Sequence, residues 1–415
     1  MAGRSAVDLA RRSFGPSIAL LAAVLPLAPS LAPVSMAIML FLGVVGGEMS
    51  FNSFRSLTWK GPLLWMVVFY LWHLVGLGWT INMDFAALDL GIKLPLLVFP
   101  LLGAAGVRSA LRGPAIQAFI AANILSVAIA LGLASYHSLD YMLHVRPDEV
   151  CSGYTASVPF FASNFSWALH PSYMALYLTM ALVLVLNRSS LSGSFNGRWQ
   201  VVVLALGVVL CASKAGWIAL AGLGVLELHK ALQDPGRRRR ALGGLVLATV
   251  AVGALYGGSS LVQERVAQVV GSLGAGPEVP VQANSTSDRK QVWIAAVELI
   301  AAQPWLGVGT GDVKDALMAK YAELDYEDPL QKRLNAHDQY LNTAVALGLP
   351  AAICLVALIL VPLWSARRHG EHAMVALLLL CGFNWAVESM LEVQAGVLFL
   401  SFFAWSLTDK RSALT

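Results

Sequence analysis

The sequence predicts an all-α polytopic membrane protein with about twelve transmembrane helices and one large helical loop outside the membrane. Three observations predict this class. The 415 residues are 57% hydrophobic and only 13% charged, unlike a soluble globular domain. Apolar runs of nearly membrane-spanning length recur along the chain. Most Lys and Arg residues fall in every second connection between these runs, as the preference for positive charge on the cytoplasmic side requires.

The chain opens with two apolar runs, 17–28 and 31–46. Arg4, Arg11 and Arg12 precede them in the manner of a signal peptide, but a pair of helices whose first member is retained fits better. The other predicted spans are 61–79, 88–105, 114–136, 169–186, 199–212, 216–232, 241–256, 349–364, 372–387 and 396–407. We therefore expect spans one to nine in residues 1–256, the outer loop in 257–348 and spans ten to twelve in 349–415.

The outer loop has helical patterning of its own. An apolar face over 259–270 predicts one amphipathic helix. A capping box at Ser285–Asp288 opens a second helix that runs to about Ala302, with one apolar face. We expect these helices to lie on the membrane or to cap the bundle. Residues 307–311 predict a tight turn; they are rich in glycine but follow no strand, which argues against a nucleotide site.

Residues 335–341 form a polar patch in a predominantly apolar chain. Asn335 is a suitable N-cap, Asp338 stands three residues later, and Gly348 is placed to end the helix. This places His337 in the first helical turn, where the positive helix end keeps its imidazole neutral and able to accept a proton at pH 7. Alone, such a histidine is more often a solvated side chain at a helix start.

Other polar residues are predicted on the same outer side. The topology places there Lys214, Arg265, Arg289, His170 and Glu388. Cations at helix N-termini on a membrane surface suit a phosphorylated lipid, and several together could neutralise a leaving pyrophosphate. Each also has a structural explanation: Lys214 could snorkel, Arg265 could meet a lipid headgroup, and Arg289 could pair with Asp288 or Glu298.

Two further charged groups have mainly structural readings. Lys93 lies in an apolar span, and an (i, i+4) pair with Asp89 explains it best. The acids 323–328 are read as a solvated face rather than a metal site. The sequence predicts no metal, no cofactor and no nucleic-acid partner; membrane lipids are the expected surroundings.

Three elements resemble those of bacterial O-antigen ligases and polymerases. Residues 213–217 look like their Ser-Arg/Lys-x-x-Trp element. The stretch from Arg289 through Trp293 to Pro304 and Gly309 resembles their Arg-x-x-x-Trp…Pro-x-x-Gly-x-Gly element. Residues 335–341 are similar to their His-Asn-x-Tyr-Leu signature. The resemblance covers roughly 205–349, and the combination in this order is more specific than any one piece.

The resemblance implies a membrane glycosyltransferase of GT-C-like architecture in the inner membrane, with its active site facing the periplasm. The donor would be a glycan on undecaprenyl pyrophosphate, the acceptor a sugar hydroxyl of the lipid A core, and the reaction inverting and independent of metal. His337 would be the base, and Arg289, Arg265 and Lys214 would hold the pyrophosphate. The residues implied in orienting these groups or binding substrate are Asp338, Tyr340, His170 and Glu388.

Two positions depart from the family pattern. Asp338 stands where Asn is usual, and Lys214 stands where Arg is common, so the bidentate fork is lost there. An O-antigen polymerase or a protein O-oligosaccharyltransferase uses the same logic with another acceptor. The chain ends about eight residues after its last predicted span, which favours a lipid-linked acceptor. A glycan transporter is disfavoured because the polar groups gather at the outer rim rather than at mid-membrane.

Overall fold

The computed structural model describes residues 2–49, 57–105, 111–144, 158–192, 198–234 and 285–408, with four isolated positions between 235 and 284. Within these ranges every regular element is a helix, so the predicted all-helical class is confirmed for the described chain. The chain forms two compact units, one of residues 1–118 and 280–415 and the other of residues 119–279. The two units are described separately below.

The first unit begins with the expected pair of helices, α1 (Ala2–Leu27) and α2 (Ala32–Val45), which pack against each other. The next predicted span is α3 (Pro62–Val75), extended by a 3-10 turn over Gly76–Trp79. The span expected at 88–105 is instead two helices, α4 (Met83–Lys93) and α5 (Pro95–Ala104). Leu94 between them keeps a helical backbone (φ −51°, ψ −35°), and Pro95 explains the division because it cannot donate a backbone hydrogen bond.

The organising element of the first unit is α16 (Gln339–Arg368), whose backbone breaks at Gly348 (φ 76°, ψ 178°). A break leaves helix carbonyls without intrahelical partners. Here the Val308 and Gly309 amides donate to the Val345 and Ala346 carbonyls, both at 2.9 Å, and Leu349 N donates to Pro304 O at 2.8 Å. The helix boundary predicted at Gly348 is therefore a real discontinuity, stabilised by pairing with residues 304–309.

The glycine-rich turn is a docking element. Asp312, which follows it, accepts hydrogen bonds from the Ile81 and Asn82 amides, both at 2.8 Å. Thr310 Oγ1 donates to the His73 carbonyl at 2.7 Å. A side chain at Gly311 would place its Cβ 2.1 Å from the Asn82 carbonyl oxygen. The glycines thus allow the outer loop to lie against the connection between α3 and α4.

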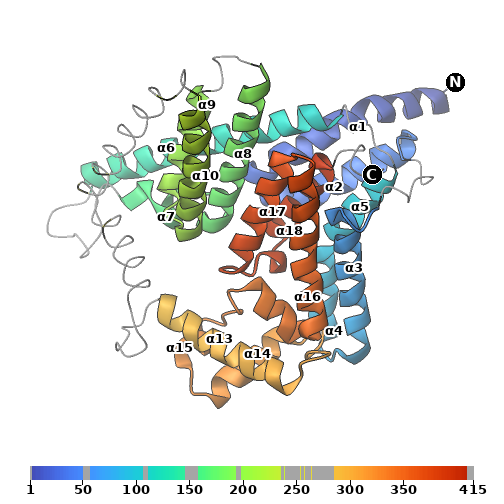
Figure 1. Ribbon diagram of the computed structural model, residues 1–415, viewed down its shortest axis with the longest axis vertical. Coiled ribbons are helices and arrows are strands. Elements are labelled where there is room, and N and C mark those ends of the chain that lie inside the picture. The colour runs from blue at the N-terminus through green and yellow to red at the C-terminus, as the bar shows by residue number, and fades with distance from the viewer. Residues whose placement is uncertain are drawn as a thin grey trace. The chain divides into compact units, whose positions relative to one another are not determined.

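The outer loop contributes three helices, α13 (Ser285–Ala302), α14 (Val313–Glu323) and α15 (Glu327–Gln331). They gather near the Gln339 end of α16 (Figure 1). The bounds of α13 are those predicted, and its expected face is buried, with Val292 and Ala296 fully covered and Leu299 and Ile300 partly buried. The helix packs against α14 and α16, and the expected position on the membrane stays a prediction. The helix expected at 259–270 lies outside the described residues.

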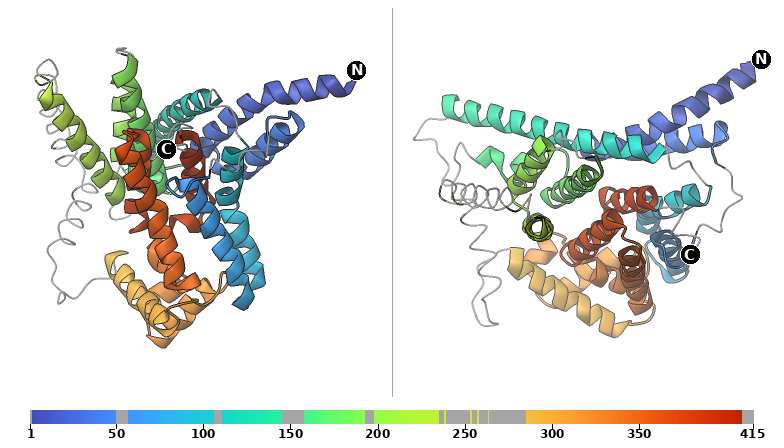
Figure 2. Two further views of the ribbon diagram at one scale, coloured as in Figure 1. Left: turned by 45° about the vertical axis from the view of Figure 1, so that its right-hand side comes forward. Right: turned by 45° about the horizontal axis from the view of Figure 1, so that its top comes forward.

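The last two spans are α17 (His372–Trp385) and α18 (Gln394–Leu407). Every residue of α18 from Ala395 to Ser406 is buried, which makes it the central helix of this unit. It packs against α3, α5 and α17, while α3 runs alongside α16 in both views of Figure 2. The residues 386–393 that join α17 to α18, hereafter the 386–393 turn, include a short 3-10 segment, Met390–Glu392.

The second unit contains most of α6 (Arg112–His144), together with α7 (Ala162–Phe165), α8 (Pro171–Ser192), α9 (Arg198–Leu210) and α10 (Lys214–Gln233). Helix α8 packs on both α9 and α10. Small residues allow these close approaches, since a Cβ at Gly216 would stand 2.7 Å from Ala175 Cβ.

Five helices in the described chain are long and apolar enough to cross a membrane: 62–79, 83–104, 112–144, 214–233 and 339–368. Five further apolar helices are shorter, at 29–45, 171–187, 199–210, 372–385 and 394–407. All of these fall on predicted spans, whereas the span predicted at 241–256 lies outside the described residues. The architecture is therefore a multi-pass helical bundle, and the count of twelve stays a prediction.

Candidate functional site

The candidate site is built around Glu388 in the first unit. Its carboxylate contacts two of the predicted residues at once. Oε2 lies 3.3 Å from His337 Nδ1, and Oε1 lies 3.3 Å from Arg289 Nη2. The Glu388 side chain is only 16% exposed, against 28% for His337 and 32% for Arg289. The carboxylate is thus the covered centre of the group, and the two basic side chains remain accessible beside it.

These three side chains come from distant parts of the chain. Arg289 lies in the first turns of α13, His337 precedes α16, and Glu388 belongs to the 386–393 turn. The Glu388 amide donates to the Asn384 carbonyl at 2.9 Å, which continues the last turn of α17 and fixes where the side chain starts. The spacing of these residues along the sequence did not indicate that Glu388 would contact both His337 and Arg289.

The helix start at His337 differs from the prediction. The N-cap is Asp338, not Asn335, and α16 begins at Gln339, so His337 lies before the helix and not in its first turn. Asp338 Oδ1 accepts from the Leu341 amide at 2.8 Å, while Asn335 Oδ1 accepts from the His337 amide at 2.9 Å. Both residues have side chains that satisfy backbone amides. The Asn335 bond closes a side-chain turn before the helix, and the Asp338 bond caps the helix start.

His337 is held in a left-handed conformation with φ 46°. Such strain persists only where the surroundings enforce it, and it is concentrated at functional sites. The surroundings here are specific: Trp293 Nε1 on α13 donates to the carbonyl of buried Ala336 at 3.1 Å. The loop is therefore fastened to α13 on one side of His337 and to α16, through Asp338, on the other.

Neither carboxylate proposed as a structural partner of Arg289 takes that role. Asp288 pairs with Lys332 at 2.8 Å, and Glu298 lies 3.7 Å from Lys320. The first of these pairs raises the pKa of Lys332, chiefly through its hydrogen bond to Asp288. Two acids of the 323–328 cluster also face lysines: Glu323 lies 2.8 Å from Lys320, and Asp328 lies 3.7 Å from Lys332.

Two of the predicted orienting residues, Asp338 and Tyr340, have local roles. Asp338 caps α16, and its pKa is raised because burial outweighs the amides that favour its ionised form. The Tyr340 hydroxyl donates to the Gly382 carbonyl of α17 at 3.1 Å. This bond joins α16 to α17 and is not directed at His337.

The remaining predicted residues belong to the second unit or lie outside the description. Lys214 is the first residue of α10, after the N-cap Ser213, as the predicted turn requires. His170 is exposed before α8, and its Nδ1 accepts from the Ser172 amide at 3.4 Å. Arg265 is outside the described residues. The structure therefore brings together His337, Arg289 and Glu388, whereas Lys214 belongs to the second unit and the place of Arg265 stays a prediction.

A buried charged cluster adjoins the site and was only partly foreseen. The predicted contact between Lys93 and Asp89 is present, but Lys93 Nζ also lies 3.3 Å from both Glu392 oxygens. Gln339 Nε2 donates to Glu392 Oε1 at 2.9 Å, and its Oε1 accepts from the Leu391 amide at 2.6 Å. The sequence signals for this cluster were a lysine within an apolar span and Asp89 one turn before it.

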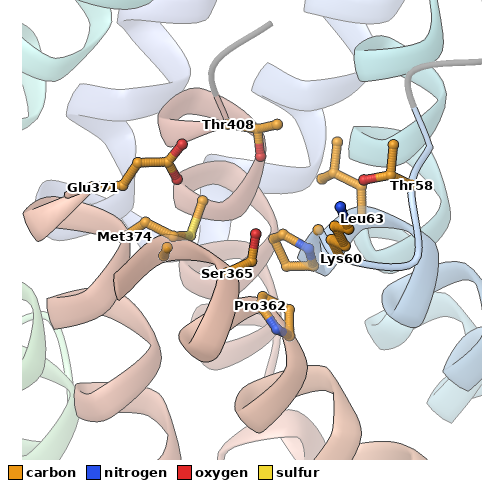
Figure 3. Close-up of a pocket in the computed structure, with 11 residues that line it drawn as sticks. Thr58, Lys60, Leu63, Pro362, Ser365, Glu371, Met374 and Thr408 are labelled. Atoms are coloured by element: carbon orange, nitrogen blue, oxygen red, sulfur yellow. The ribbon is translucent and has the colours of Figure 1, made fainter. Parts of the chain in front are cut away.

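A separate pocket opens at the other end of α16 (Figure 3). Its lining joins the start of α3 to the ends of α16 and α18 and the start of α17, with Lys60, Ser365, Glu371 and Thr408 among its polar residues. None of the predicted site residues lines it. The candidate site is thus the polar group at the Gln339 end, and this pocket belongs to the opposite end of the same helix.

Comparison with known protein families gives a match over residues 199–356. This segment matches the family described as O-antigen ligase. The comparison with curated proteins gives no match. The matched segment contains Lys214, Arg289 and His337, three residues on which the resemblance rests, and it ends after the break in α16. Over residues 199–356 this multi-pass helical protein is therefore similar to the O-antigen ligase family.

Proposed function

We propose that this protein transfers an O-antigen glycan from undecaprenyl pyrophosphate to a sugar hydroxyl of the lipid A core, at the periplasmic face of the inner membrane. The observation that carries the proposal is the contact of one covered carboxylate, Glu388, with both His337 and Arg289. The family match supports lipopolysaccharide glycan transfer in general. The identities of donor and acceptor are part of the proposal.

The contact between His337 and Glu388 supports a proton-accepting role. An ionised carboxylate accepts hydrogen bonds and cannot donate one, so Nδ1 carries the proton that faces Glu388. In the neutral ring the other nitrogen, Nε2, then carries no proton and can accept one. The same division of labour orients the histidine of hydrolase triads. Nε2 would take the proton from the acceptor hydroxyl as its oxygen attacks the sugar.

The reaction is a single displacement. The acceptor oxygen forms a bond to the anomeric carbon while the bond from that carbon to the phosphate oxygen breaks. The configuration inverts, and undecaprenyl pyrophosphate leaves with the bonding electrons. Arg289 has five N–H donors, of which the Glu388 contact uses the Nη2 group, so others are available for phosphate oxygens. Cationic side chains in this position stabilise charge as it develops, without a metal.

Lys214 and Arg265 complete the proposed pyrophosphate clamp, and His170 and Tyr340 complete the substrate site. For these residues the support is the family resemblance. Lys214 has the required position at a helix N-terminus, where backbone amides add to its charge.

The test is reconstitution of the purified protein with lipid A–core and a polyprenyl-pyrophosphate glycan. Wild-type protein is expected to place the glycan on the core. His337→Ala is expected to lower the rate by about 10²- to 10⁴-fold, the range for loss of a general base. His369→Ala is the matched control, since that exposed histidine follows the far end of α16 and should leave the rate unchanged.

Three results would contradict the proposal. Normal transfer of glycan to the lipid A core by folded His337→Ala protein would show that His337 is not the base. Lengthened polyprenyl glycans with no product on the core would indicate a polymerase. Product on an added protein acceptor alone would indicate a protein O-oligosaccharyltransferase.

A further inference from the structure

A buried charged cluster connects α4 to the 386–393 turn. Lys93 is 1% exposed and Asp89 4% exposed, and the Lys93 ammonium contacts the carboxylates of both Asp89 and Glu392. Charged groups are tolerated at such depth only when they are paired, and an intramembrane lysine is more often functional than incidental. Burial raises the pKa of Glu392, but Lys93 and Gln339 outweigh burial and the net shift is downward, so the carboxylate stays ionised.

The cluster holds the end of the 386–393 turn from two sides. Lys93 binds the Glu392 carboxylate from α4, and Gln339 binds both that carboxylate and the Leu391 amide from α16. Gln339 itself is completely buried, and its amide also reaches Thr343 Oγ1 at 3.2 Å. The position of residues 391 and 392 is therefore determined by a network of charge-assisted and neutral hydrogen bonds.

The same turn carries Glu388, four residues earlier. Little slack exists between them: Met390 and Leu391 are buried, and a Cβ at Gly396 would stand 2.0 Å from the Met390 carbonyl oxygen. The Met390 amide donates to the Glu388 carbonyl at 2.9 Å. A shift at Glu392 is thus passed to Glu388, whose two contacts at 3.3 Å have no spare length.

We propose that Lys93 is a positioning residue for glycan transfer: by pairing with Glu392 it fixes the 386–393 turn where Glu388 contacts His337 and Arg289. Lys93 touches neither His337 nor Arg289 in any contact of the described chain, so it acts through the turn. The inference rests on the proposed function for its kinetic consequence, but the placement of the turn is independent of that function.

The kinetic test is a double-mutant cycle between Lys93→Met and Glu388→Gln. Methionine keeps the length of the lysine stem and removes its charge. Lys93→Met is expected to lower kcat by about tenfold or more, since a displacement of about 1 Å at a catalytic group costs up to about 10²-fold. The donor KM is expected to stay close to wild type. In the Glu388→Gln background the same substitution should add little, because the oriented carboxylate is already lost.

The structural test is amide hydrogen exchange across residues 386–393. The Leu391 amide is bonded to Gln339, so release of the turn should speed its exchange in Lys93→Met protein. Lys60→Met is the matched control, because Lys60 lies before α3 at the end where the other pocket opens. It should change neither kcat nor exchange in this segment.

The outcomes separate cleanly. Three results would each overturn the inference. The first is a wild-type kcat in folded Lys93→Met protein, and the second is a fold-loss of kcat from Lys93→Met that is as large in the Glu388→Gln background as in wild type. The third is unchanged amide exchange across residues 386–393. If Lys93→Met does not fold, Glu392→Gln replaces it in the same cycle with the same expected results, since it removes the charge facing Lys93 and keeps an amide toward Gln339. If wild-type protein transfers no glycan, the proposed function fails, and the exchange experiment alone decides whether Lys93 fixes the turn.

Discussion

His337 occupies a backbone conformation that non-glycine residues rarely adopt, and the two residues beside it show why the loop accepts it. Ala336 is fastened by Trp293, and Asp338 is fastened by its cap bond. The imidazole is thereby directed to Glu388. Strained backbone of this kind persists where the surrounding structure enforces it.

Asp338 allows the capping role to be separated from a catalytic one. Asn and Asp are comparable N-caps, whereas alanine at this position costs about 1 kcal/mol. Asp338→Asn is therefore expected to keep the cap and glycan transfer with no loss of stability, and Asp338→Ala to lose about 1 kcal/mol of stability with transfer retained in the folded fraction. Thermal unfolding in detergent and the transfer assay measure the two effects. Abolished transfer in Asp338→Asn would show that the carboxylate has a chemical role.

The stability difference between wild type and Asp338→Asn should depend on pH, because burial raises the pKa of Asp338. The folded pKa lies above the unfolded one, so ionisation costs the folded state stability. The cost is absent below the ordinary pKa of about 3.9 and complete above the raised value. Asp338→Asn should therefore gain in melting temperature over wild type near neutral pH, and this gain should vanish as the pH falls through that window. A constant difference across the window would contradict this assignment.

At the scale of elements, the break in α16 positions the site, because it turns the helix start toward the outer loop. Gly348 has φ 76°, and a Cβ there would stand 2.3 Å from the Trp305 carbonyl oxygen. Gly348→Ala is expected to destabilise the protein by about 2 kcal/mol or more through strain and backbone collision. The free energy of unfolding in detergent measures this.

Gly370 provides the control for that experiment. Its φ is 70°, nearly the same, but nothing lies within 4 Å of an added Cβ. Gly370→Ala should therefore cost only the conformational strain, about 1 kcal/mol. Equal losses in the two variants would show that the docking of residues 304–309 contributes nothing to stability.

Local signals predicted α13 well and the start of α16 poorly, for a physical reason. The capping-box pattern at Ser285–Asp288 and Pro304 predicted both ends of α13 from its own sequence. The patch 335–341 holds two residues able to cap, Asn335 and Asp338, and a tertiary bond from Trp293 to Ala336 fixes the chain between them. The pairing of Glu388 with His337 spans 51 residues and could not be read from spacing. Lys93 was noticed as a buried cation, but its partner Glu392 comes from 299 residues away.

At the scale of the whole molecule, the two ends of the first unit differ in charge. One end gathers Lys60, Arg112, Arg367 and Arg368 around the pocket of Figure 3 and the ends of α16 and α18. Arg368 lies 3.8 Å from the Trp364 ring centroid and Arg112 5.3 Å from that of Trp405. Basic residues with aromatic neighbours are typical of the cytoplasmic membrane interface. The candidate site lies at the other end of α16, which is the arrangement that a periplasmic reaction requires.

This polarity predicts the outcome of cysteine labelling in intact cells of a Gram-negative host. Cys151 is replaced by serine, and single cysteines are introduced at Lys290, exposed on α13, or at His372, exposed at the start of α17. A maleimide that crosses the outer membrane but not the inner one should label Lys290→Cys. It should label His372→Cys only after the inner membrane is permeabilised, because that residue lies at the basic end. The Cys151→Ser parent measures the background from the three remaining cysteines, of which Cys211 and Cys381 are buried and Cys354 is half-buried. Labelling of His372→Cys in intact cells, with Lys290→Cys protected, would place the His337 end in the cytoplasm, where a periplasmic acceptor could not reach it.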